Sequence, residues 1–332
     1  MYHARFKGSH YECGYNYGKI LKNHGIKIDS CPTFPITKNR IEFGKKCLKI
    51  YKEIYPEVIE EIKGFAEGNE TSFEFLSTLL LTMYCFNADN KCSCFAFKNK
   101  DNIIFGRNSD FLVNIEKLYM NVLHKLDNVY AFNGNTTAFI EIEDGINEYG
   151  LSIGLTFIAS KEIKPGLNIG MLIRYILEKC KTVKEALQFL KSVPIASTGT
   201  LTMIDNNGEM AVVECSPREI KIIKEENNYV KATNIFVSDE LKDLNLKDFD
   251  NWRALDRYKT IETAFNNNEE KDLLFSKNLL SGKYGFMCQY DRKTNADTVW
   301  SVIYDVKNKK IYRVEGNPSR KEFKEDNRMK FK

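Results

Sequence analysis

The chain has 332 residues, with 49 lysines and arginines against 45 aspartates and glutamates, and a formal net charge of +4. This length suits one large domain or two small ones, and the small net charge gives no reason to expect nucleic acid or an anionic membrane as a partner. The nine cysteines are an odd number scattered along a long chain, which argues against a disulfide framework and fits a reducing compartment.

The first residues carry no apolar core of the kind found in signal peptides. The longest apolar run, residues 73–86, contains Glu74, Ser77 and Thr78 and is too short to span a bilayer. We therefore expect a cytoplasmic protein that has no membrane partner.

Residues 1–91 are predicted to be helical. Apolar residues recur at helical spacing across residues 39–67, and Pro56 marks a break or the start of a helix. Thr71 and Glu74 have the spacing of a capping box, which predicts a second helix after them.

The predicted structure changes to strands after a polar break at residues 87–91. Residues 92–97 are short and apolar, residues 98–102 are polar turn material, and residues 103–105 are apolar again. This pattern predicts a β-hairpin.

The open end of this hairpin carries reactive and charged side chains. The start of one antiparallel strand lies beside the end of its partner, so Cys92 is expected near Arg107, Asn108 and Asp110. A thiol beside a fixed cation has a lowered pKa and becomes a nucleophile at neutral pH. Cys92 and Cys94 form a C-x-C pair, but no second cysteine or histidine cluster lies nearby. We therefore do not expect a structural zinc site.

The rest of the chain alternates between groups of strands and helices. In chain order we expect strands at residues 118–126, 137–143 and 151–158, two helices within 166–193, strand pairs at 201–204 with 209–214 and at 219–223 with 229–235, a helix at 250–265, and a hairpin of residues 298–305 and 310–314. Turns are expected at Asp144-Gly145 and at Asn206-Asn207-Gly208. Two antiparallel sheets with helices outside them satisfy this order, whereas a parallel doubly wound fold needs a regular strand–helix alternation that is absent.

The chain is poor in histidine, which is the usual base of a cysteine hydrolase. Only His124 lies beyond the helical prefix, and its strand context favours an ordinary structural histidine. The α-amino group of a nucleophile that is itself the first residue is another base, with an unperturbed pKa of about 7.7–8.0. This base requires a cut between Lys91 and Cys92. From the residues alone, the favoured interpretation of Cys92 and Cys94 is two small residues in a buried strand.

At these residues the sequence resembles a known family. CSCFAF followed by GRNSDF is similar to the nucleophile hairpin of the N-terminal-nucleophile hydrolases of the choloylglycine hydrolase and acid ceramidase type. The closest branch is the acyl-CoA:6-aminopenicillanic acid (isopenicillin N) acyltransferase-like one. The resemblance continues along nearly the whole chain, through Gly14 and Gly18, Asn147-Glu148 with Gly150-Leu151, Ala196-Ser197, Val213-Glu214, Ala232-Thr233-Asn234, and Val314-Glu315-Gly316 with Pro318.

The resemblance implies an α+β fold, the αββα four-layer sandwich of two antiparallel sheets flanked by helices. It also implies an inactive precursor, or zymogen, that cuts itself before the nucleophile. Residues 1–91 are then a helical precursor segment that becomes the small chain, residues 92–332 form the catalytic region, and the two together make one structural domain. It implies neither a cofactor nor a metal.

Roles carry over residue by residue from the matching motifs. Cys92 matches the nucleophile, Arg107 matches the arginine beside the thiol, and Asp110 matches the carboxylate that holds the new α-amino group. Arg253 is the first candidate for a helix arginine near the substrate, and Arg257 competes with it.

Three further positions depart from the residues common in the family. Thr156 and Thr200 stand where relatives often have asparagines that help to form an oxyanion hole, and backbone N–H groups are the alternative donors. Lys91 stands where a glycine often precedes the nucleophile.

The sequence and the resemblance together leave three possible functions. The first is an autoprocessed cysteine enzyme that hydrolyses a linear amide in a small acylated amine through a thioester on Cys92. The second is acyl transfer from acyl-CoA to an amine. The third is an uncut, non-catalytic relative that acts as a binding protein, which Lys91 and the two threonines favour. The acyl group, the amine and the oligomeric state, a homo-oligomer included, stay open.

Overall fold

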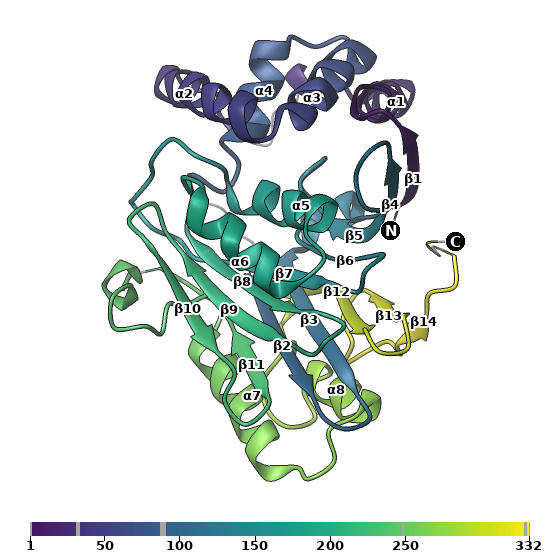
Figure 1. Cartoon of the computed structure of the whole chain (residues 1–332), viewed down its shortest axis with the longest axis vertical. Coiled ribbons are helices and arrows are strands. Elements are labelled where there is room, and N and C mark those ends of the chain that lie inside the picture. Colours follow the sequence, from purple (N-terminus) through teal and green to yellow (C-terminus); the bar gives the residue numbers. More distant parts are fainter. Residues whose placement is uncertain (1, 31–33, 87–90, 248, 329–330, 332) are drawn as a thin grey trace.

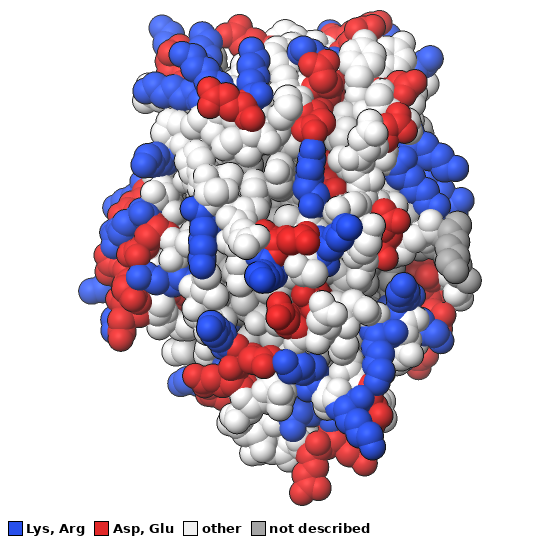
Figure 2. Space-filling view, in the orientation of Figure 1, with Lys and Arg blue, Asp and Glu red and all other residues white. Residues whose placement is uncertain are grey.

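The structure is a computed structural model of the whole chain and describes residues 2–30, 34–86, 91–247, 249–328 and 331. Two β-sheets form its centre, while α1 to α4 gather at one end of the molecule and α7 and α8 lie at the other (Figure 1). Basic and acidic side chains are mixed over the face seen in Figure 2.

The larger sheet has eight strands. In spatial order they are β1 (Tyr2–Gly8), β4 (Met120–Leu126), β5 (Phe132–Thr136), β6 (Asp144–Asn147), β7 (Ser152–Phe157), β8 (Gly199–Ile204), β9 (Met210–Cys215) and β10 (Ile220–Lys224). Every neighbouring pair is antiparallel except β1 with β4, which is parallel.

The smaller sheet has six strands and is antiparallel throughout. In spatial order they are β11 (Tyr229–Ala232), β2 (Lys91–Lys98), β3 (Ile103–Leu112), β12 (Ala296–Asp305), β13 (Lys310–Glu315) and β14 (Lys324–Glu325). The hairpin predicted around Cys92 is therefore confirmed as β2 and β3, and it lies inside this sheet rather than at its edge.

Eight α-helices surround the sheets in the described residues. They are α1 (His10–Asn23), α2 (Lys38–Ile54), α3 (Pro56–Asn69), α4 (Phe73–Leu81), α5 (Ile169–Lys179), α6 (Val183–Ser192), α7 (Ala254–Asn267) and α8 (Leu273–Leu280). Pro56 begins α3, so the expected break is confirmed. The cap of α4 is Ser72, whose hydroxyl accepts from the Phe75 N–H, and not the expected Thr71.

Side-chain alternation along β2 shows how the layers stack. Cys94 and Ala96 share a buried cluster with Ile204 and Val212 of the larger sheet, so this face of β2 meets that sheet. Phe95 and Phe97 belong to a second cluster; its helical members are Ile261, Ala264, Phe265, Phe275, Leu279 and Leu280 of α7 and α8. The opposite face of β2 therefore meets these helices.

The outer face of the larger sheet is covered by α5 and α6. Leu155 of β7 shares the main core cluster with Ile173 of α5 and Ala186 of α6. The order of layers is thus helices, sheet, sheet, helices, and the expected αββα sandwich is confirmed.

Residues 1–91 are not wholly helical as predicted, because β1 pairs with β4 over seven residues. Helices α1 and α3 cross in close contact, since a Cβ on Gly14 would lie 1.9 Å from the Glu61 carbonyl oxygen and one on Gly64 would lie 2.0 Å from that of Tyr11. This contact explains the Gly14 and Gly18 spacing noted in the sequence.

Buried charges join this N-terminal segment to the rest of the chain. The guanidinium of Arg174 on α5 donates to both carboxylate oxygens of Glu61 on α3, at 2.8 and 2.5 Å. Glu178, also on α5, accepts hydrogen bonds from His10 and Tyr55. His124 receives a bond from Arg174, so it belongs to this network.

Three predictions on strands and turns are wrong. Residues 137–143 form buried turns and not a strand, because the Glu143 carboxylate binds the N–H and hydroxyl of Thr137 and folds the chain back on itself. Asp144-Gly145 is no turn but the start of β6. The strands β10 and β11 do not pair, since β10 extends the larger sheet and β11 the smaller one.

Among the described residues, no helix combines the length and apolar character needed to cross a bilayer. Within the same residues, no group of three or more histidine, cysteine or acidic side chains is arranged to hold a metal ion.

Candidate active site

The register of the β2–β3 hairpin brings the predicted residues together. Lys91 lies opposite Asp110, Cys92 opposite Ser109, and Cys94 opposite Arg107. Residues 87–90 of the expected polar break lie outside the described residues. The peptide bond between Lys91 and Cys92 lies at the start of β2, between the first two residues of this strand that pair with β3.

The Cys92 thiol lies beside Arg107, as expected. Nη2 of Arg107 donates to Sγ of Cys92 at 2.8 Å, and both side chains are fully buried. The guanidinium is fixed on its other sides, since Nη1 donates to Asp144 at 2.7 Å and Nε to the Leu155 carbonyl at 3.1 Å. Glu143 lies 3.4 Å from Nη2.

Asp144 holds Arg107 in place through a larger hydrogen-bond network. Besides Arg107, its carboxylate accepts from Trp300 Nε1 at 2.8 Å and from the Tyr304 hydroxyl at 2.6 Å. Asn135 Nδ2 is a fourth donor at 2.5 Å. A buried carboxylate with four donors cannot swing away, so the cation beside the thiol has one fixed position.

The expectation of a thiol with a lowered pKa is wrong for this chain. Burial raises the pKa of Cys92 to about 12, although the Arg107 guanidinium lowers it. Removing the thiol from water disfavours the thiolate more than one neighbouring cation favours it, in part because Glu143 and Asp110 add negative charge nearby. The thiol therefore keeps its proton at neutral pH unless a base takes it.

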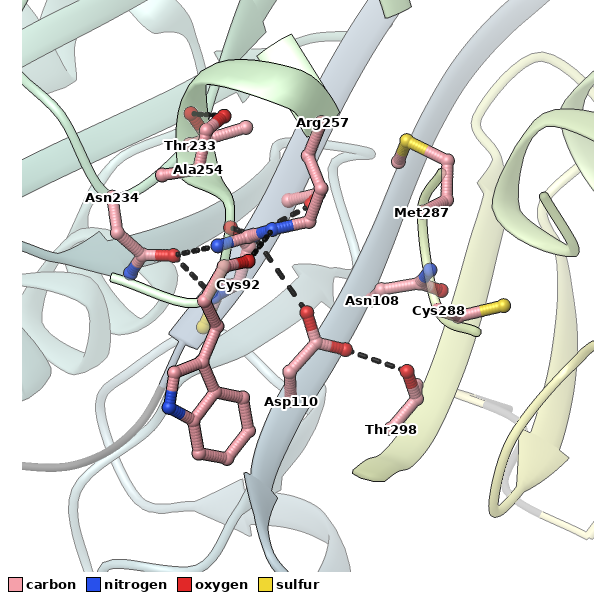
Figure 3. Close-up of polar contacts among 12 residues, drawn as sticks. Cys92, Asn108, Asp110, Thr233, Asn234, Ala254, Arg257, Met287, Cys288 and Thr298 are labelled. Carbon is pink, nitrogen blue, oxygen red and sulfur yellow. Dashed lines mark hydrogen bonds and ion pairs between the residues drawn. The ribbon is translucent and has the colours of Figure 1, made fainter. Parts of the chain in front are cut away.

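The backbone of Cys92 is held at both ends of the residue. Its N–H donates to Oδ1 of Asn234 at 2.8 Å, and its carbonyl oxygen accepts from Nη1 of Arg257 at 2.5 Å (Figure 3). Arg257 also donates to Asn234 Oδ1, at 2.9 Å. The amide group of Asn234 has one orientation, because its Nδ2 donates to the Phe157 carbonyl at 2.6 Å.

Asp110 is a buried carboxyl close to the same arginine. One oxygen accepts from the hydroxyl of Thr298 at 2.6 Å, and Oδ2 lies 3.7 Å from Nη1 of Arg257 (Figure 3). Oδ2 also accepts from the hydroxyl of Tyr290 at 2.9 Å. Burial raises the pKa of Asp110 to about 6, although Arg257 and the two hydroxyls lower it. This carboxyl therefore carries a charge at pH 7 that its surroundings only partly compensate.

The structure places Arg257, and not Arg253, against Cys92. Arg253 is the residue before α7, where its guanidinium pairs with Asp256 at 2.8 Å and lies over the Phe286 ring. Arg257 falls on the buried face of α7. That face repeats at helical spacing in the sequence, so the phase of the helix could have distinguished the two arginines.

Thr156 and Thr200 lie side by side on β7 and β8 with their hydroxyl oxygens 2.8 Å apart. Thr156 donates to the Thr233 carbonyl at 2.7 Å, so Thr200 must donate to Thr156. Both hydroxyl protons are thus engaged within the protein, and neither is directed at an incoming oxyanion.

Several residues that contact the site were not named as candidates from the sequence. They are Asp144, Glu143, Asn234, Tyr290 and Thr298. Only Asn234 had a signal, as part of the Ala232-Thr233-Asn234 motif. The others come from distant strands and loops, which no local pattern connects to Cys92.

The chain is similar in sequence to known proteins. A family model described as acyl-coenzyme A:6-aminopenicillanic acid acyl-transferase matches residues 97–320. A penicillin V acylase from Pectobacterium atrosepticum is 27% identical over 135 residues, which are 35% of this chain and 35% of that protein. The match to this curated relative therefore spans about a third of its length.

Solved structures give a more distant likeness. A penicillin V acylase from Agrobacterium tumefaciens has a TM-score of 0.47 at 17% identity, covering 68% of this chain and 82% of that one. An N-acylethanolamine-hydrolyzing acid amidase ortholog from Caenorhabditis elegans has 0.47 at 18%, covering 65% and 93%. A mutant conjugated bile acid hydrolase from Clostridium perfringens has 0.45 at 16%, covering 68% and 89%.

Proposed function

Because the chain belongs to the acyl-coenzyme A:6-aminopenicillanic acid acyl-transferase family, we propose that it is a cysteine enzyme that cuts itself and then hydrolyses a linear amide. One observation carries this proposal. The Cys92 thiol lies 2.8 Å from the buried Arg107 guanidinium, while the nitrogen of the same residue lies 2.8 Å from Asn234 Oδ1. A nucleophile and the atom that would become its base are therefore both fixed on one residue.

Self-cleavage begins with attack of Cys92 Sγ on the carbonyl carbon of Lys91. The C–N bond breaks as the Cys92 nitrogen takes the proton, and Lys91 is left as a thioester on the sulfur. Water then hydrolyses this thioester. The products are the fragments 1–91 and 92–332, which we propose stay together as one structural domain, and a free α-amino group on Cys92.

Catalysis uses the new α-amino group as the base. Burial keeps the thiol protonated at neutral pH in the uncut chain, so the reaction needs a group that accepts this proton. An α-amino group has an unperturbed pKa of about 7.7–8.0, which suits that role. Asn234 Oδ1 would accept one of its N–H bonds, and Arg107 would stabilise the developing thiolate.

In the amide reaction, Sγ attacks the acyl carbonyl and the α-amino group passes the proton to the leaving nitrogen. Water, activated by the same amino group, then releases the acid from the thioester. We propose that Asp110 supplies the counter-charge for the protonated amino group, because it lies opposite Lys91 in the hairpin and next to Arg257. Arg257 is proposed as a positioning residue, since it holds the Cys92 carbonyl.

The substrate class proposed is a small acylated amine. The family description names an acyl transferase and the curated relative is named an acylase, so an amine in place of water as the acceptor is the second candidate. Product analysis with water and a competing amine separates the two. Each of the eight cysteines that the structure describes is a free thiol, which supports a reducing compartment such as the cytoplasm.

The test compares Cys92→Ala with Cys94→Ala on a panel of chromogenic acyl amides. Cys94 is a matched control because its buried thiol lies 3.7 Å from the Leu155 carbonyl, two residues along the same face of β2. Loss of turnover in Cys92→Ala with turnover kept in Cys94→Ala is expected. Full activity of Cys92→Ala would overturn the mechanism, and an uncut wild-type protein that no amide probe labels would point to the non-catalytic binding protein.

A further inference from the structure

Lys91 is the residue before the proposed cut, and its side chain is buried to an unusual degree for a lysine, with 2% exposed. Its Nζ lies 4.7 Å from the centre of the Phe249 ring and 5.5 Å from that of the Trp252 ring. An ammonium over two aromatic faces is attracted by their electron-rich surfaces, and the attraction grows as water is excluded.

The Trp252 ring is held in position by its surroundings. It packs edge to face on Tyr290, with ring centres 5.5 Å apart, and its carbonyl accepts from Nε of Arg257 at 3.1 Å. Tyr290 in turn binds Asp110. Trp252 is therefore connected directly to the residues around Cys92. Phe249 and Trp252 are called the aromatic pair below.

In the proposed reaction, the acyl group of the substrate takes the place of Lys91. In self-cleavage Cys92 Sγ attacks the Lys91 carbonyl, and in the proposed catalysis it attacks the acyl carbonyl of the substrate. Both steps give a thioester on one sulfur whose position Arg107 fixes. The subsite requires that the end of fragment 1–91 leaves β2 after the cut while the rest of the fragment stays bound. The aromatic pair is then left to contact whatever extends from the new carbonyl.

We propose that the aromatic pair is an acyl subsite that selects an acyl group with a cationic end. This inference rests on the proposed function. Lysine itself defines the separation between the attacked carbonyl carbon and the cation, because five carbons lie between its carbonyl carbon and Nζ. The 6-aminohexanoyl group has the same separation, and heptanoyl is its match in length with a methyl group in place of the ammonium.

The reaction for such a substrate is balanced by the groups already named. Sγ adds to the 6-aminohexanoyl carbonyl, its proton passes through the Cys92 α-amino group to the leaving amine, and the C–N bond breaks. Water then attacks the thioester, the C–S bond breaks, and 6-aminohexanoate leaves while the thiol regains its proton.

The experiment measures kcat/KM of the self-cleaved protein for the 6-aminohexanoyl and heptanoyl amides of an aminocoumarin. We expect about a tenfold preference for the cationic amide, as one or two cation–π contacts provide. Phe249→Leu should reduce this ratio at least about threefold. Tyr15→Leu is the control, because Tyr15 on α1 faces the Lys19 ammonium at 5.9 Å, and it should leave the ratio unchanged. An equal or faster turnover of the heptanoyl amide, or an unchanged ratio in Phe249→Leu, would overturn the subsite.

Calorimetry with the two free acids gives a readout that needs no turnover. Tighter binding of 6-aminohexanoate than of heptanoate supports the subsite even if neither amide is cleaved, in which case only the proposed function fails. Equal binding of the two acids, or none, overturns the subsite.

Discussion

Asp110→Asn should stabilise the uncut protein at neutral pH. The carboxyl is fully buried, and burial raises its pKa from 3.8 to about 6 although Arg257, Thr298 and Tyr290 oppose this. Below pH 3.8 the group is protonated in both the folded and the unfolded chain. As pH rises from 3.8 to 6, the unfolded chain releases the proton while the folded chain keeps it, so the free energy of unfolding falls.

The size of this loss follows from the two pKa values. Each pKa unit corresponds to about 1.4 kcal/mol, so ionised Asp110 lowers the free energy of unfolding by about 3 kcal/mol above pH 6. Asparagine carries no charge and keeps an oxygen acceptor for Thr298. The stability that Asp110→Asn gains over its parent should therefore increase by about 2 kcal/mol between pH 4 and pH 7.5.

The assay is urea unfolding at pH 4, 5.5 and 7.5, in a Cys92→Ala background that keeps the chain uncut. Asp326→Asn is the control with the opposite sign, because Arg328 and Arg313 hold the pKa of Asp326 at about 2 against its partial burial. Its charged form stabilises the fold above pH 3.8, so this variant should be the less stable one at pH 7.5. A difference in free energy of unfolding between Asp110→Asn and its parent that does not change with pH would show that ionisation of Asp110 does not destabilise the fold.

Three further substitutions test other parts of the structure. Gly14→Ala should lower the free energy of unfolding by about 3 kcal/mol in urea melts, because the new Cβ would lie 1.9 Å from the Glu61 carbonyl oxygen. Glu61→Gln leaves the buried Arg174 without its bidentate partner, so unfolding should cost about 3 kcal/mol less and fragment 1–91 should separate on gel filtration at lower urea. Arg107→Lys keeps the charge but loses the fork that binds Asp144 and Cys92 together, so kcat should fall about a hundredfold with little change in KM.

The sequence was informative where the pattern is local. Two short apolar runs separated by polar turn residues predicted the β2–β3 hairpin, and the pairing rule for antiparallel strands placed Arg107 near Cys92. Pro56 and the helical periodicity located the break between α2 and α3. The order of helices and strands favoured two antiparallel sheets with helices outside them, and the resemblance to the family specified the αββα sandwich.

What the sequence did not provide depends on contacts between distant segments. Asn234 lies 142 positions beyond Cys92 along the chain, and the hydroxyl of Thr298 lies 188 positions beyond Asp110. The expected direction of the shift in the Cys92 pKa was wrong for the same reason. The sequence of a strand does not tell how completely two sheets exclude water from one thiol.

Self-cleavage before Cys92 is the central claim, and intact mass of the purified protein tests it most directly. We expect two masses, those of residues 1–91 and 92–332, for the wild-type protein and a single uncut chain for Cys92→Ala. A wild-type protein that cleaves amides while its mass remains that of the whole chain would rule out the α-amino group of Cys92 as the base, since no free α-amino group would then exist on Cys92.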